Sequence, residues 1–216
     1  MPRRVSHENR RLELAEAVWR VIERDGFEAL SMRRIAEEAA WSLGAVAHYF
    51  PNKDALLTFA YELAMQREGD RYRGQSQPFS GLAALGAAAR AAVCLTPDAY
   101  TSSLIWLAFL PRATCREDLR MIQKREQTDF RECLAAFIEG GIEQNTPGRE
   151  LDCGLEATLL ASFLDGLTLQ ALLEPEEYTP ERQVQLLDAY LEGRGLSASR
   201  ASPVHDRSAE RDDSST

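Results

Sequence analysis

The segment at residues 31–57, SMRRIAEEAAWSLGAVAHYFPNKDALL, constrains the fold of this chain more than any other. Ser31 and Ser42 each stand before a short run with helical spacing, and serine at such a position caps a helix by accepting a hydrogen bond from a free backbone N–H. Pro51 cannot extend the second run without losing a backbone hydrogen bond, and Asn52 is a suitable cap for another helix. The segment therefore predicts two short helices joined by a tight turn, a sharp stop, and a longer helix directly after it.

The remainder of the chain also has helical periodicity, and no period-two pattern predicts a strand. We expect an all-α fold of about nine helices. The first should cover about residues 7–24 and end at Asp25-Gly26, because glycine readily takes the backbone conformation that terminates a helix. Further helices are expected at residues 53–73, 81–95, 99–110, 116–143 and 150–173 and from Pro180 onward, with a loop at 74–80.

Three parts of the chain are expected from these patterns. Residues 1–53 should form a three-helix domain that contains the helix-turn-helix, and residues 54–196 a second helical domain. Residues 197–216 have no apolar side chain apart from alanines and one valine, so they should form a disordered tail.

Composition narrows the class of protein. No run of 18 apolar residues occurs, so no membrane span is expected, and the charged N-terminus does not have the pattern of a secretory signal. The four cysteines stand far apart without metal-binding spacing, which predicts reduced thiols in a cytoplasmic protein, and neither metal nor cofactor. A redox-sensing cysteine pair is the alternative.

The net charge of −9 is distributed unevenly. Residues 1–54 carry nine Lys or Arg and nine Asp or Glu, whereas the remaining residues carry 16 and 25. The acidic excess therefore lies in the C-terminal part, and basic residues near the helix-turn-helix can form a local patch that attracts phosphates. The patch would consist of Arg3, Arg4, Arg10, Arg11, Arg33, Arg34 and Lys53.

The N-terminal 60 residues resemble the DNA-binding domain of the TetR family of transcriptional repressors. Three motifs carry the resemblance: Gly26-Phe27 after the first helix, Ser31-x-x-x-Ile35-Ala36 in the second, and GAVAHYFPNKDALL at 44–57. In the C-terminal part, SLIWLAF at 103–109 and LLASFLDGL at 159–167 are similar to the BetI-like subgroup. Two residues depart from the family pattern: Trp41 replaces a small aliphatic residue, and Ala47 replaces an aromatic residue that many relatives have.

A helix-turn-helix places its second helix in the major groove of double-stranded operator DNA. We expect the first residues of that helix to lie over base edges, with one further donor later in the helix, two phosphate contacts at its end, and one contact from the preceding helix. These are Ser42, Leu43, Gly44 and Ala45, then His48, then Tyr49 and Lys53, and Arg33. Two alternatives stay open, because Gly44 could be a packing glycine and His48 a surface histidine without a role.

One such domain contacts few phosphates, so a homodimer on a palindromic operator is expected. Its interface should be a four-helix bundle formed by the last two helices of each subunit: Leu155, Leu159, Phe163, Leu167, Val184, Leu187 and Leu191. The resemblance also implies an effector pocket in the middle helices, with the aromatic candidates Tyr100, Trp106, Phe109 and Phe130. The effector is an unknown small molecule, for which the BetI resemblance suggests a quaternary ammonium compound.

These features favour a repressor that a small-molecule effector releases from DNA. The alternatives are an activator, a global nucleoid binder, or a helical small-molecule carrier or enzyme that retains a non-functional helix-turn-helix. We expect no enzyme, because general-base catalysis would have little material. His48 lies in the reading helix, and His7 and His205 lie in predicted tails.

Overall fold

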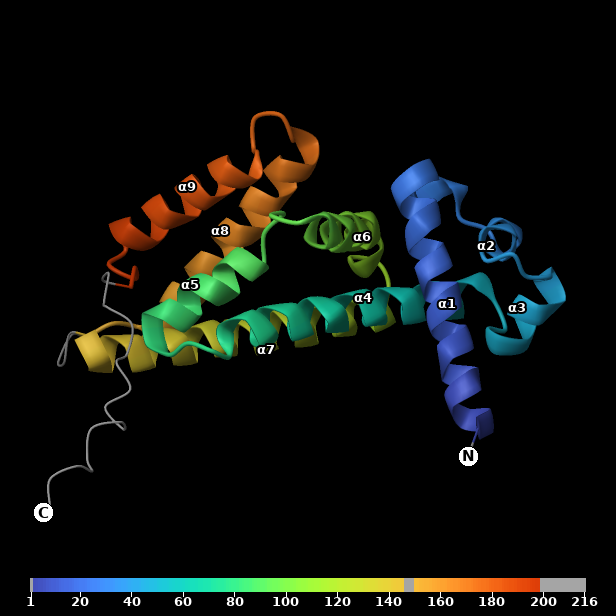
Figure 1. Cartoon of the computed structure of the whole chain (residues 1–216), viewed down its shortest axis with the longest axis horizontal. Coiled ribbons are helices and arrows are strands. Elements are labelled where there is room, and N and C mark those ends of the chain that lie inside the picture. Colours follow the sequence, from blue (N-terminus) through green and yellow to red (C-terminus); the bar gives the residue numbers. More distant parts are fainter. Residues whose placement is uncertain (1, 146–149, 199–216) are drawn as a thin grey trace, which may run out of the picture.

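The computed structural model describes residues 2–145 and 150–198. Within these ranges the chain forms nine α-helices, a short 3₁₀ helix and no strand (Figure 1), which confirms the all-α prediction. The elements are α1 (Pro2–Asp25), η1 (Phe27–Ala29), α2 (Met32–Glu38), α3 (Leu43–Tyr49), α4 (Lys53–Ser76), α5 (Gly81–Ala91), α6 (Pro97–Ala113), α7 (Glu117–Asn145), α8 (Cys153–Leu173) and α9 (Pro180–Gly193). Residues 199–216 of the predicted tail lie outside the described residues.

The predicted caps define the helix-turn-helix. The side chains of Ser31, Ser42 and Asn52 each accept a hydrogen bond from the backbone N–H three residues later, over 3.1, 3.1 and 2.8 Å. Gly26, with φ 80° and ψ 168°, ends α1 in a region of backbone conformation almost reserved for glycine. These local interactions explain why the sequence pattern located α2, α3 and the start of α4 correctly.

Three helices are longer than predicted. α1 begins at Pro2, and α4 continues to Ser76, into the predicted loop. Ser76 is buried, and its hydroxyl donates to the Arg73 carbonyl over 3.1 Å, which fixes the last turn of α4. α6 runs through Pro111 to Ala113, because the exposed Pro111 removes only one N–H and the Thr114 hydroxyl donates to the Pro111 carbonyl over 2.7 Å.

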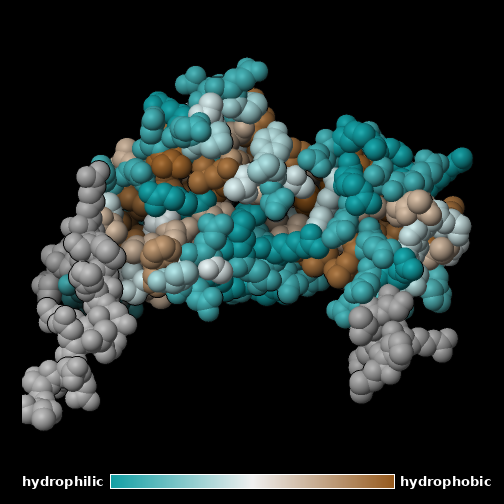
Figure 2. All heavy atoms as spheres, viewed as in Figure 1, coloured by the Kyte–Doolittle hydropathy of each residue, from teal (hydrophilic) through white to brown (hydrophobic). Residues whose placement is uncertain are grey.

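Helices α4 and α7 run side by side and connect the two ends of the molecule (Figure 1). Figure 1 shows α1, α2 and α3 at one end of α4, and α5, α8 and α9 gathered toward its other end, with α7 running alongside α4 and α6 between the two groups. We call α1, η1, α2 and α3 the head. Figure 2 shows a mostly hydrophilic face, with hydrophobic residues visible mainly around α5, α8 and α9 and where α4 meets the head.

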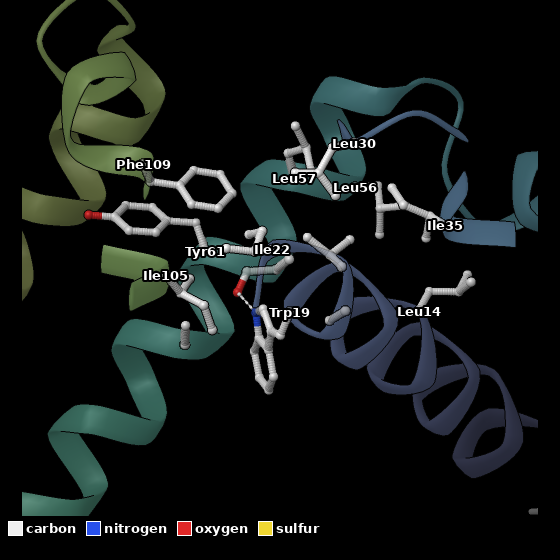
Figure 3. Close-up of a cluster of buried hydrophobic side chains, with 14 of the residues drawn as sticks. Leu14, Trp19, Ile22, Leu30, Ile35, Leu56, Leu57, Tyr61, Ile105 and Phe109 are labelled. Carbon is white, nitrogen blue, oxygen red and sulfur yellow. Dashed lines mark hydrogen bonds between the residues drawn. The ribbon is translucent and has the colours of Figure 1, made fainter. Parts of the chain in front are cut away.

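The core that supports the head includes residues from beyond it. Figure 3 shows Leu14, Trp19, Ile22 and Ile35 of the head packed with Leu56, Leu57 and Tyr61 of α4 and with Ile105 and Phe109 of α6. The Trp19 indole N–H donates to the Ala60 carbonyl over 3.1 Å. The head is thus joined to α4 and α6 by a continuous apolar core, and a displacement of either helix would be transmitted to it. A second core joins α5, α7, α8 and α9.

Candidate nucleic-acid interface and cavity

Helix α3 packs against the rest of the chain with one side, and its other side is exposed to solvent. Val46 is fully buried, whereas Leu43 is 50% exposed and Gly44, Ala47 and His48 are exposed. A methyl group added at Gly44 would meet no atom within 4 Å. Packing within the chain therefore does not require glycine there, which removes the basis for the packing alternative.

Tyr49 lies in an aromatic cluster at the end of α3. Its ring centroid is 4.8 Å from that of His7, 5.4 Å from that of Trp41 and 5.2 Å from that of His48. The Arg10 guanidinium lies 5.3 Å from the Trp41 ring centroid. The unusual Trp41 is accommodated by an edge-on contact, at 62°, with the ring of Tyr49, the predicted phosphate contact.

The turn between α2 and α3 contains a strained residue. Ala40 has φ 57°, and the Trp41 backbone N–H donates to the Ala36 carbonyl over 2.9 Å. A non-glycine residue pays a steric penalty in this left-handed conformation. The angle between α2 and α3 is therefore maintained by the surrounding contacts against a local backbone preference.

Several basic residues of the predicted patch have partners within the chain. The Lys53 ammonium donates to the Leu30 carbonyl over 2.6 Å and is half-buried. The Arg34 guanidinium is 2.9 Å from the Asp25 carboxylate. Arg33 differs, because its side chain is 85% exposed and forms a surface ion pair with Glu37 at 3.1 Å. A phosphate contact by Lys53 stays a prediction, and the structure shows an additional structural role for this residue.

An ion-pair network that the sequence analysis did not identify ties α2 to α1. The Glu38 carboxylate forms ion pairs with the guanidinium groups of Arg20 at 3.0 Å and Arg24 at 2.8 Å. The Asp25 carboxylate forms ion pairs with Arg24 and Arg34. The Arg24 guanidinium, helped by Arg34, holds the pKa of Asp25 at about 2. The network orients α2, and through the turn it orients α3. The alternating charges at these positions were visible in the sequence, but their pairing depends on the angle between the helices.

A cavity of about 80 Å³ lies between α4, α6, α7 and α8. Of the four aromatic candidates, Trp106 and Phe130 line it, but Tyr100 and Phe109 do not. Phe109 is fully buried in the core below the head, where its ring stacks on that of Tyr61 at 4.8 Å and 15°. The other lining residues are Met65, Glu68, Gly69, Tyr72, Ala92, Ser103, Gln123, Glu126, Gln127, Leu164, Asp165 and Thr168.

Three of the residues that line the cavity are acidic. Burial raises the pKa of Glu68 to about 7 despite the Arg71 guanidinium 3.1 Å away. Burial also raises the pKa of Asp165, opposed by the Gln127 amide, whose nitrogen lies 3.3 Å from a carboxylate oxygen. Glu126 is paired with Arg125 at 3.0 Å. These carboxylates were not predicted, although Asp165 in the otherwise apolar α8 was a visible signal.

The predicted interface residues divide into two groups within one chain. Leu155 and Leu159 on α8 are 54% and 39% exposed, whereas Leu167, Leu187 and Leu191 are buried in the core of the single chain. The half-buried Phe163 stacks on Tyr190 of α9 at 4.3 Å, and Val184 is half-buried. The buried leucines therefore hold α8 and α9 in place, and the open apolar surface belongs to α8.

Two further features bear on the sequence predictions. Within the described residues, α8 is the one helix long and apolar enough to cross a membrane by length and composition, and 44% of the relevant window is buried inside the chain. All four cysteines lie in the described ranges and are free thiols. No group of three His, Cys, Asp or Glu residues in those ranges is arranged to hold a metal ion.

Comparison with known proteins places the chain in a family. The family models "Bacterial regulatory proteins, tetR family" and "BetI-type transcriptional repressor, C-terminal" match residues 14–58 and 82–195. The HTH-type transcriptional regulator PksA of Bacillus subtilis is 30% identical over 195 residues, which cover 89% of this chain and 93% of that protein. The HTH-type transcriptional regulator BetI of Paraburkholderia phytofirmans is 26% identical over 201 residues, covering 89% and 96%.

A solved structure has the same fold. A protein of Saccharomonospora viridis, described as a transcriptional regulator and crystallised in complex with choline, superimposes with a TM-score of 0.78 at 22% identity. The match covers 86% of this chain and 96% of that chain. The resemblance deduced from the helix-turn-helix and from the BetI-like motifs is thus confirmed, and this chain belongs to the TetR family of transcriptional regulators.

Proposed function

We propose that this protein is a cytoplasmic homodimeric repressor that binds a palindromic operator through α3 and leaves it when a small organic cation enters the cavity. The observation that carries the proposal is the open face of α3, where a Cβ atom at Gly44 would meet no atom within 4 Å and Leu43 is half-exposed. A helix with its buried side anchored and its outer side made of small residues fits the major groove closely.

The eight predicted DNA contacts have different roles in this proposal. Residues from Ser42 to Ala45 at the start of α3 lie over base edges, and the exposed His48 adds a donor. Tyr49 contacts phosphate from within its aromatic cluster, and Arg33 contacts phosphate or guanine from the front of α2. Lys53 lies at the start of α4, where releasing the Leu30 carbonyl would be the condition for contacting phosphate.

Dimer formation is supported by the exposed apolar residues of α8. Leu155, Leu159 and Leu173 of α8 are 54%, 39% and 62% exposed. The exposed Ser162 lies two helical turns after Leu155, so it belongs to the same face of α8. Since residues 1–54 are electrically neutral, one head would bind DNA weakly and two heads in register would provide the phosphate contacts that a specific complex needs.

A cationic effector is supported by the chemistry of the cavity wall. Glu68, Glu126 and Asp165 bring three carboxyl groups to the wall, and the rings of Tyr72, Trp106 and Phe130 provide aromatic surface. A bound cation would favour the ionised form of Glu68 and Asp165, which burial disfavours in the free protein. An organic cation would gain from both, through ion pairing and through cation–π attraction. The choline bound to the Saccharomonospora viridis protein belongs to this chemical class.

Selection of bound duplexes from a random pool at fixed salt tests the DNA-binding proposal. We expect an inverted repeat that the protein protects over both half-sites. Gly44→Asp places a carboxylate on the reading face without a steric conflict and should abolish the selected binding. Gly74→Asp, at an exposed α4 position where a Cβ also meets no atom within 4 Å, is the matched control and should bind normally. Selection of unrelated sequences, or equal loss in both variants, would count against the proposal.

The effector class needs a separate comparison. Choline and 3,3-dimethylbutanol have nearly the same shape, but only choline is charged. If the cavity selects cations, choline should raise the melting temperature of the protein and release the selected duplex at concentrations where the alcohol does neither. Equal effects of the two compounds would show that charge is not recognised.

A further inference from the structure

We propose that Gln123 and Tyr61 form the contact through which occupancy of the cavity changes the position of the DNA-reading head. The inference rests on the proposed function, because it assigns residues to the coupling between that cavity and the operator. Tyr61 acts in it as a positioning residue, since it does not itself line the cavity and lies on α4, outside the DNA-reading helix α3.

Gln123 is the member of this pair that an effector would meet. It projects from α7 and lines both the cavity and an adjoining groove, which extends over Trp106, Arg131 and Ser162. Its side-chain carbonyl oxygen accepts a hydrogen bond from the Tyr61 hydroxyl. A ligand that donates to the same oxygen, or displaces the Gln123 side chain, therefore competes directly with Tyr61.

Tyr61 is fully buried in α4 and belongs to the core that supports the head. Burial raises the pKa of its hydroxyl, so the hydroxyl stays protonated and needs an acceptor. A buried hydroxyl without a partner is costly, and loss of the Gln123 acceptor favours a different position of the Tyr61 side chain.

The ring of Tyr61 is connected to the head through two aromatic contacts. It stacks on Phe109 of α6 at 4.8 Å and 15° (Figure 3), and Phe109 meets Phe27 of η1 edge-on at 5.0 Å and 84°. Phe27 is also covered by the Arg112 guanidinium at 3.5 Å, which pairs with Glu28 at 3.3 Å. The path thus leaves the cavity wall on α7, crosses α4 and α6, and enters the head at η1.

η1 lies between α1 and α2, where a movement can change the position of the DNA-reading helix α3. It ends at Ala29, two residues before Ser31 caps α2, and the intervening Leu30 carbonyl holds Lys53 at the start of α4. A rearrangement of Phe27 therefore reaches both ends of the helix-turn-helix. Packed aromatic contacts tend to switch between discrete arrangements, and couplings of this kind typically change an affinity by about 5- to 150-fold.

Gln127 provides a matched control within the same wall. It lies one turn further along α7 and lines the same cavity and groove, but its amide donates to Asp165. A change at Gln127 alters the cavity to a similar extent without removing the acceptor of Tyr61. Tyr61→Phe provides the second control, since it keeps the ring and removes only the hydroxyl.

Hydrogen exchange in the free full-length protein tests the coupling without knowledge of effector or operator. Gln123→Leu should accelerate amide exchange across residues 27–49 at least about fivefold, whereas Gln127→Leu should leave it within about twofold of wild type. In the Tyr61→Phe background the acceleration by Gln123→Leu should disappear, because no hydroxyl is left without a partner. Equal acceleration in both backgrounds, or none in either, would overturn the proposal.

A second measurement separates this inference from the proposed function. Affinity is measured for a duplex selected by the wild-type protein, and Gln123→Leu should weaken it at least about fivefold while Gln123→Leu/Tyr61→Phe recovers wild-type affinity. If the wild-type protein selects no duplex, the proposed function fails, but the exchange data still decide the coupling. Should Gln123→Leu not fold, Gln123→Asn withdraws the acceptor by one methylene group and is subject to the same criteria.

Discussion

Glu68 should make the stability of the protein fall as the pH rises. Burial raises the pKa of its carboxyl from 4.5 to about 7, so between these values the folded protein holds a proton that the unfolded chain has released. The free energy of unfolding therefore decreases with pH across this window. The stabilising contribution of protonation is fully present below about pH 4.5 and is lost above about pH 7.

The size of the effect follows from the same two pKa values. A pKa difference of one unit corresponds to about 1.4 kcal/mol, so the full difference is worth about 3 kcal/mol. The pKa of about 7 already includes the opposing effect of Arg71, but the Glu68 side chain is 24% exposed, and solvent screening should reduce the observed value to about 2 kcal/mol.

Urea unfolding of wild type and Glu68→Gln at pH 5 and pH 8 measures this contribution, because other groups that titrate are common to both proteins. We take the free energy of unfolding of Glu68→Gln minus that of wild type at each pH. This difference should be about 2 kcal/mol larger at pH 8 than at pH 5. Any cost of the amide that does not depend on pH cancels in this comparison. Glu62→Gln, at a half-exposed position on the same helix, controls for removal of a carboxylate without burial. A Glu68→Gln difference that does not change with pH would refute the reasoning.

Three other substitutions test the head and the interface. Ala40→Gly should stabilise the protein by about 0.5 kcal/mol in urea unfolding, because relief of the strain at φ 57° exceeds the entropy cost of glycine. The control Ala39→Gly, at φ −76°, should destabilise the protein. A change of the same sign in both variants would contradict this account. Lys53→Met should cost about 1–2 kcal/mol of stability even without DNA, since the Leu30 carbonyl loses a charged donor, and an unchanged unfolding midpoint would rule out this structural role. Leu159→Glu should give folded monomers in sedimentation at micromolar concentration, whereas persistence of a wild-type dimer would place the interface elsewhere.

Local signals were sufficient to predict the helix-turn-helix. The caps at Ser31, Ser42 and Asn52 and the stop at Pro51 act within three or four residues, so the sequence contains everything that determines them. The exposed side of α3 could also be predicted, because burial of Val46 fixes the rotation of such a short helix.

The cavity could not be predicted in the same way. Its wall combines residues from four helices, and the angle of α6 decides that Trp106 faces the cavity while Phe109, three residues later, enters the core below the head. Leu187 and Leu191 are buried within the single chain, and the helical spacing of apolar residues does not distinguish burial within one chain from burial between two chains. Likewise, the partner of Lys53 is a backbone carbonyl, which no pattern of side chains reveals.

In the proposed mechanism, the cost of the buried carboxylates and the control of DNA binding have a common origin. Glu68 and Asp165 lie where burial disfavours their charge, and an apolar cavity would make the free protein more stable. A cation that enters this cavity relieves the cost, so part of its binding free energy comes from the unfavourable state of the free protein. The same cation would arrive beside Gln123, whose hydrogen-bond partner Tyr61 belongs to the core that supports the head. A site that is stable when empty would have less to gain from its ligand and therefore less free energy available to move the head.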